Sequence, residues 1–224
     1  MNMSHGAPAR CYTCPLGVAA GVPKGESCPF IPKEREPGVL LYVEGDCADR
    51  VWYVVSGYVA LSREAGESRG MGVTWAVRRP GEVLGAEALV SGTYRDSAKL
   101  LTPTTLCAAS REVVDGWLGP ETSPARALVQ LLVKARCHEA PRRSGSDGGA
   151  PRRVAQWLLD DAPGGSAPPI PRSVVAALLG MQPETFSRAL AQLASEGAIT
   201  VDRKAIRVAN FDALVRAAGD DAES

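Results

Sequence analysis

Cysteines form the first chemically informative pattern in this chain of 224 residues, which contains six of them. Cys11 and Cys14 make a C-x-x-C pair, and Cys28 follows further along the chain. Two thiolates three residues apart can bind one metal centre from a single turn, and a third can come from a nearby loop. The pattern leaves three chemistries open: an iron–sulfur cluster, a zinc site, and a thiol–disulfide switch between Cys11 and Cys14.

A second group of polar side chains lies nearer the C-terminus, where Glu184, Ser187 and Arg188 are spaced at i, i+3 and i+4. On a helix this spacing places the three side chains on one face. Arg pairs with guanine, and Glu accepts a hydrogen bond from the amino group of cytosine, so this face can read base edges. A solvated face with a local ion pair is the alternative, and the surrounding elements favour base reading.

The helix that carries this face is the second of two short amphipathic helices. The first is expected from about residue 172 to 179, with Gly180 as its C-terminal stop, and Pro183 lies in the first turn of the second. Another face of the second helix is an apolar stripe, which consists of Phe186, Ala189, Leu190 and Leu193. Two helices joined by a glycine turn predict a helix-turn-helix that enters the DNA major groove.

Two short runs of alternating apolar and polar residues follow, on either side of a polar turn at residues 202–204. This pattern predicts a β-hairpin, the wing of a winged helix. Arg203, Lys204 and Arg207 can contact DNA phosphates there, which adds affinity without sequence preference. Residues 151–208 carry a net charge of +2 although the whole chain is neutral, so we expect localised DNA contacts.

Short β-like runs separated by glycine turns occupy residues 37–118 and predict a barrel or a sandwich. A helix is expected after them, with Ser123 as its N-cap and Pro124 at its first position. Its apolar residues recur as a heptad-like seam, which suits a partner helix in a dimer or, alternatively, a stripe packed on the β domain. The seam consists of Ala125, Leu128, Leu132 and Ala135.

These patterns divide the chain into five parts and give an α+β fold class. A Cys-rich arm covers residues 1–32, a β-rich sensor domain covers residues 33–119, and a dimerisation helix covers residues 120–141. A Gly-rich flexible linker covers residues 142–150, and the DNA-binding domain covers residues 151–219.

Composition narrows the class of protein further. No apolar run approaches the roughly 20 residues needed to cross a bilayer, and the first residues lack the layout of a signal peptide. We therefore expect a cytoplasmic protein, in which structural disulfides are rare. The chain shows no Ser/His/Asp set, no phosphate-binding glycine loop followed by Lys and no paired acidic motif, so we do not expect an enzyme.

Three sequence phrases resemble the CRP/FNR superfamily of bacterial transcription regulators. Two are E-G-D…V-W-Y-V-V-S-G and P-G-E-V-L-G in the β-rich region, and the third is P-E-T-F-S-R at residues 183–188, which is similar to the recognition helix of the FNR-like branch. The resemblance implies an N-terminal cyclic-nucleotide-binding-type β-roll, a dimerisation helix and a C-terminal winged helix-turn-helix. It also implies a homodimer that binds double-stranded DNA at an inverted repeat resembling TTGAT-N4-ATCAA, with RNA polymerase as a partner.

The resemblance also implies a sensor chemistry. FNR-like regulators hold an oxygen-labile 4Fe-4S cluster on an N-terminal cysteine group plus a distant cysteine of the β-roll, which implies as ligands here Cys11, Cys14, Cys28 and Cys107. Cys107 matches the distant ligand because Glu112 falls five residues after it, as in the family pattern, and Cys47 is the alternative. Oxygen and nitric oxide are the signals that such a cluster implies.

A cyclic-nucleotide effector is disfavoured by a displacement of one position. Regulators of the CRP type grip phosphate with an Arg directly before a Ser, whereas this chain has Arg95-Asp96-Ser97. A slip of one residue in a strand turns the Arg to the opposite face and leaves a carboxylate where it would repel phosphate. A different small-molecule effector stays open as an alternative to the cluster.

Overall fold

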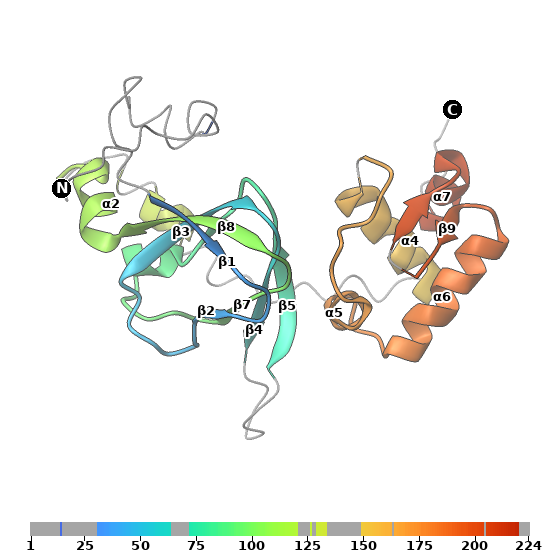
Figure 1. Cartoon of the computed structure of the whole chain (residues 1–224), viewed down its shortest axis with the longest axis horizontal. Coiled ribbons are helices and arrows are strands. Elements are labelled where there is room, and N and C mark those ends of the chain that lie inside the picture. The colour runs from blue at the N-terminus through green and yellow to red at the C-terminus, as the bar shows by residue number, and fades with distance from the viewer. Residues whose placement is uncertain are drawn as a thin grey trace.

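The computed structural model describes residues 14, 31–63, 72–120, 126, 129–133, 149–162, 164–203 and 205–219. They form a β-rich N-terminal domain and a mostly helical C-terminal domain (Figure 1), which confirms the α+β class. Within these ranges no helix is both long enough and apolar enough to span a bilayer. The predicted linker up to residue 148 lies outside the described residues, and so do Cys11, Cys28, Leu128, Ala135 and Lys204.

Two four-stranded antiparallel sheets make up the β domain. The spatial order in the first sheet is β1 (Ile31–Arg35), β8 (Thr104–Ser110), β3 (Arg50–Ser56) and β6 (Val83–Leu84). The order in the second sheet is β2 (Leu40–Tyr42), β7 (Ser97–Leu100), β4 (Val59–Arg63) and β5 (Val73–Arg78). The domain also contains the 3-10 helix η2 (Ala86–Leu89) and helix α2 (Arg111–Leu118).

Strand alternation separates two apolar clusters in this domain. On β8, Leu106 belongs to the large core, whereas its neighbour Cys107 belongs with Ala109 to a small cluster of their own. Successive side chains of a strand point to opposite faces, so Cys107 lies on the outer face of the first sheet. The large core is centred on stacked aromatic rings, those of Tyr42, Trp52 and Tyr94.

The C-terminal domain confirms the predicted helix-turn-helix and wing. Its elements are α4 (Ala150–Asp161), α5 (Arg172–Leu178), α6 (Pro183–Ser195), β9 (Ile199–Val201), β10 (Ile206–Val208) and α7 (Phe211–Ala218). Apolar side chains of all four helices meet in one core, among them Val154, Leu158, Phe186, Leu193 and Leu214. Helix α4 begins one residue before the predicted boundary, because Pro151 occupies a first-turn position where a missing N–H costs nothing.

The turn between α5 and α6 depends on Gly180, as predicted. Its φ of +61° lies in the left-handed region, and its N–H bonds to the carbonyl oxygen of Ala177 at 3.0 Å. Helix α5 ends at Leu178, one residue earlier than predicted, because Leu179 already has the non-helical ψ of 5° as the C-cap. The glycine thus lets the chain reverse between the two helices without strain.

The two domains touch where α5 lies beside β5 (Figure 1). Arg79 directly follows β5, and its Nη1 lies 2.7 Å from Oδ1 of Asp161 and 3.4 Å from the carbonyl oxygen of Asp160. These aspartates end α4, whose last turn has no basic residue. Arg79 therefore supplies, from the other domain, the positive charge that stabilises the C-terminal end of this helix.

Candidate nucleic-acid interface and cysteine site

Helix α6 exposes the predicted base-reading side chains, those of Glu184, Ser187 and Arg188. Its other face is packed, with Phe186 only 1% exposed. The ring of Trp157 on α4 meets the ring of Phe186 edge-on, with 6.4 Å between the centroids, and so holds α6 against the domain. The predicted separation of a polar face from a buried stripe is confirmed, and the reading of bases by these three residues stays a prediction.

Asp202 braces the turn of the wing. One of its carboxylate oxygens accepts a hydrogen bond from the backbone N–H of Ala205 at 2.7 Å, and the other pairs with the guanidinium of Arg207 at 2.7 Å. Its backbone carbonyl accepts a hydrogen bond from Arg172, at the start of α5, at 2.6 Å. Arg203 is exposed in the same turn. The wing is thus tied directly to the helix-turn-helix.

Cys107 is buried on β8, between two neighbouring strands, with 5% of its surface exposed. Its Cα partners are Pro32 on β1 and Tyr53 on β3. Paired residues of neighbouring strands point to the same face, so these three side chains lie together on the outer face of the sheet. Burial raises the pKa of the Tyr53 hydroxyl, and the thiols of Cys14 and Cys107 raise it further. Two cysteines far apart in the sequence therefore lie close to one phenol.

Among the described cysteines, Cys14, Cys47 and Cys107 all carry thiols. Cys47 is exposed in the turn between β2 and β3, and its backbone bridges to Thr93. The described residues hold no group of three or more side chains placed to bind one metal ion, and Cys11 and Cys28 fall outside them. Of the four predicted ligands the described residues thus include Cys14 and Cys107, and their binding of a metal stays a prediction.

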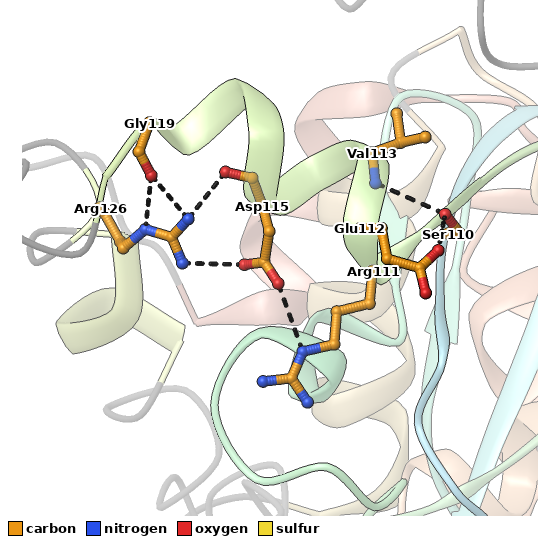
Figure 2. A network of polar contacts seen from close by, with 7 residues as sticks. All are labelled: Ser110, Arg111, Glu112, Val113, Asp115, Gly119 and Arg126. Atoms are coloured by element: carbon orange, nitrogen blue, oxygen red, sulfur yellow. Dashed lines mark hydrogen bonds and ion pairs between the residues drawn. The ribbon is translucent and has the colours of Figure 1, made fainter.

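A polar network connects the end of β8 to the next helical segment (Figure 2). Ser110 ends β8 and caps the start of α2. At the other end of α2, Nη1 of Arg126 lies 2.9 Å from the carboxylate of Asp115, and Nη2 donates to the carbonyl oxygens of Asp115 and Gly119 at 2.7 Å each. One guanidinium thus donates hydrogen bonds to the C-terminal end of α2. It links this helix to the helical segment of Arg126 and residues 129–133. Sequence reasoning missed Arg126.

A cavity of about 340 Å³ lies in the β domain, next to Leu132. Asp96 lines it, is 2% exposed, and accepts a hydrogen bond from the hydroxyl of Tyr42 at 3.3 Å. Burial is the main cause that raises the pKa of Asp96 to about 6, with Glu87 acting in the same direction. Arg95 is exposed. This confirms the prediction that a carboxyl group, rather than the neighbouring guanidinium, faces this site.

Two arginines of the cavity were not predicted. Arg63 and Arg78 lie 4.6 Å and 5.8 Å from the ring centroid of Trp75, and all three side chains line the cavity. They come from the paired strands β4 and β5. Strict alternation along paired strands is the signal that could have placed Arg63 and Arg78 on one face. A register irregularity between Leu61 and Ser62 on β4 interrupts that alternation.

Both domains match known families. Residues 32–118 match the family described as cyclic nucleotide-binding domain, and residues 152–217 match the Crp-like helix-turn-helix domain. The nitrogen fixation regulation protein FixK of Rhizobium meliloti is 30% identical over 207 residues, which cover 86% of this chain and 89% of FixK. The chain belongs to the CRP/FNR family of transcription regulators.

This CRP/FNR regulator has further relatives of the same architecture. The CRP-like cAMP-activated global transcriptional regulator of Mycobacterium tuberculosis is 24% identical over 203 residues, covering 84% of this chain and 88% of that protein. The structure of FixK2 from Bradyrhizobium japonicum is 26% identical with a TM-score of 0.70, covering 87% and 98% of the two chains. The regulator therefore binds DNA through the helix-turn-helix of α5 and α6, and its similarity to FixK supports the FNR-like branch.

Proposed function

We propose that this regulator works as a homodimer that responds to oxygen or nitric oxide through a 4Fe-4S cluster. The cluster ligands in this proposal are Cys11, Cys14, Cys28 and Cys107. One observation carries it: Cys107, the predicted distant ligand, lies on the outer face of the first sheet beside the Tyr53 phenol, whose pKa Cys14 of the N-terminal arm also raises. A shared metal centre requires this strand and the N-terminal arm to contribute cysteines to one place.

The position of β1 supports Cys28 as a further ligand. Pro32 is paired with Cys107, and Cys28 precedes Pro32 by four residues. Four residues of chain span at most about 14 Å, a separation that a shared metal centre allows. Thiolates are soft ligands, and they are the donors that iron–sulfur clusters use. When bound, the cluster supplies an iron centre that oxygen and nitric oxide can attack and break down.

Residues of the chain itself link this site to the proposed dimer interface. Strand β8 carries Cys107 and runs directly into α2, whose far end is closed by Arg126. The helical residues beyond Arg126 include Leu131 and Leu132, which are 64% and 62% exposed. Neighbouring exposed leucines favour burial against another surface, here the same helix of a second copy. We infer that a change in packing around Cys107 alters how this helix is presented to its partner.

A dimer of this kind places two copies of α6 in successive major grooves, about 34 Å apart. Glu184, Ser187 and Arg188 then read each half-site of an inverted repeat such as TTGAT-N4-ATCAA. The wing cations contact phosphates, which adds affinity without sequence preference. RNA polymerase is the partner through which the bound dimer would regulate transcription.

Purification without oxygen, followed by iron and sulfide analysis and visible absorption, tests the cluster. We expect about four irons and four sulfides per chain, with absorption that bleaches in air. Cys107→Ala should lose the complete cluster and oxygen-sensitive DNA binding, whereas Cys47→Ala, the matched control, should keep both. Zinc or no metal, with absorption unchanged in air, would contradict the cluster. It would leave a DNA-binding regulator controlled by zinc, by a thiol switch or by a small-molecule effector.

A further inference from the structure

Tyr53 is the neighbour of the buried Cys107 on the adjacent strand. It is the Cα partner of Cys107 across the β3–β8 pair, and its side chain packs against the small cluster of Cys107 and Ala109. The thiol of Cys14 is among the causes that raise the pKa of its hydroxyl. Its side chain lies beside Cys107 on the outer face of the sheet.

The burial of Cys107 depends on its neighbours across the sheet. Pro32 flanks it on the β1 side, and Tyr53 flanks it on the β3 side. Tyr53 is half-buried, whereas Cys107 is 5% exposed, so the tyrosine lies between the thiol and solvent on its side of the sheet. An aromatic ring is large and has few rotatable bonds, which makes it an effective cover.

We propose that Tyr53 is a shielding residue whose ring limits the access of small oxidants and electrophiles to the thiol of Cys107. The ring, rather than the hydroxyl, is assigned this role, because Tyr53 packs against the apolar cluster of Cys107 and Ala109 and the ring is the large apolar part of its side chain. For the thiol itself the inference is independent of any metal. For the lifetime of a cluster it rests on the proposed function.

The first experiment uses the full-length chain with metal removed by a chelator and thiols reduced. Alkylation by iodoacetamide is followed over time at each cysteine by peptide mass spectrometry. Tyr53→Ala should speed alkylation of Cys107 severalfold, and Tyr53→Phe should match the wild type. Cys47, exposed in another turn, serves as an internal control and should react at the same rate in all variants.

Val55→Ala is the matched control for general loosening of the sheet. Val55 lies on the same strand and packs against the same small cluster as Tyr53, but it is not the partner of Cys107. Alkylation of Cys107 in this variant should stay close to the wild-type rate. Equal rates in Tyr53→Ala and wild type, or equal acceleration in Tyr53→Ala and Val55→Ala, would overturn the proposal. If Tyr53→Ala fails to unfold cooperatively, Tyr53→Leu gives the same comparison.

The second experiment follows the decay of visible absorption in air, after anaerobic assembly of a cluster. Tyr53→Ala should shorten the half-life severalfold, while Tyr53→Phe should leave it unchanged. A half-life shortened as much by Tyr53→Phe would assign the effect to the hydroxyl and overturn the role of the ring. If wild-type protein assembles no cluster, the proposed function fails, and the alkylation rates still decide whether Tyr53 shields the thiol.

Discussion

The carboxylate of Asp115 lies 2.9 Å from the guanidinium of Arg126, and the two residues belong to helical segments on either side of Gly119. The Arg126 side chain is only 12% exposed, whereas Arg111, the other partner of Asp115, is 50% exposed at 3.4 Å. One carboxylate thus serves a sheltered ion pair and an exposed ion pair. Only the sheltered pair connects α2 to the segment that we place at the dimer interface.

Asp115→Ala should destabilise the protein and weaken the proposed dimer. The change leaves the sheltered guanidinium of Arg126 without its carboxylate, which costs about 1–3 kcal/mol. Arg111→Ala removes only the exposed partner and should cost less than about 1 kcal/mol. Urea unfolding and sedimentation equilibrium measure the two effects. Equal losses in both variants would show that Arg126 does not depend on Asp115.

Arg188→Ala should lower affinity for the operator while leaving thermal stability unchanged, because the side chain is exposed. Loss of a bidentate contact to guanine costs about 1–3 kcal/mol, which is a loss of roughly five- to 150-fold in affinity. Fluorescence anisotropy with operator DNA and with a scrambled duplex measures the change. Arg216→Ala removes the same charge from an exposed position on α7 and is the control. An equal loss on both duplexes would place Arg188 on phosphates rather than on bases.

Asp96→Asn should remove a pH dependence of stability. In the folded protein the pKa of Asp96 is raised from 3.8 to about 6, so the folded state favours the protonated acid. Burial of the charged Asp96 carboxylate therefore lowers the free energy of unfolding, and this effect is complete above about pH 6. The effect disappears as the pH falls toward 3.8, the pKa of this group in the unfolded chain. Asparagine keeps an acceptor for Tyr42. At pH 7 the variant should be more stable by on the order of 2 kcal/mol.

Urea unfolding of wild type and variant at pH 7 and near pH 4 tests this expectation. The gain in stability should be present at the higher pH and vanish at the lower one. The comparison with wild type at each pH cancels the titration of all other groups. A gain of the same size at both values would assign the effect to packing instead of ionisation.

Arg79→Ala should loosen the connection between the domains without unfolding either one. The side chains of the Arg79–Asp161 pair are 46% and 27% exposed, so its loss should cost less than about 1 kcal/mol. Distance distributions between labels placed in the two domains should broaden in Arg79→Ala. The double reversal Arg79→Asp with Asp161→Arg should narrow them again. Absence of that rescue would mean that contacts other than this ion pair, such as that of α5 with β5, hold the domains.

The helix-turn-helix is predictable from sequence because its signals are local. Phe186 and Leu193 repeat at helical spacing along the second helix, and Gly180 marks the reversal of the chain between the two helices. The inward direction of Asp96 is predictable for a similar reason, since a shift of one residue reverses the face of a strand.

The contacts of Tyr53 and Arg126 are not predictable in the same way, because tertiary structure sets their partners. Tyr53 faces Cys107 only through the register of two strands that are distant in the sequence. Arg126 donates to the carbonyl oxygen of Gly119, seven residues earlier in the chain. The residues next to Tyr53 or to Arg126 in the sequence name neither of these partners.

The brace formed by Asp202 has an electrostatic consequence for DNA binding. In the proposed complex Arg207 would meet the phosphate backbone already paired with this carboxylate at 2.7 Å, so the pair would bring no net charge to the contact. Affinity for DNA falls with added salt in proportion to the number of phosphates neutralised, with a slope of about −0.9 for each. The Arg207 side of the wing would therefore contribute shape and hydrogen bonds more than the release of counterions. Its contact with DNA would weaken less with rising ionic strength than that of an unpaired arginine.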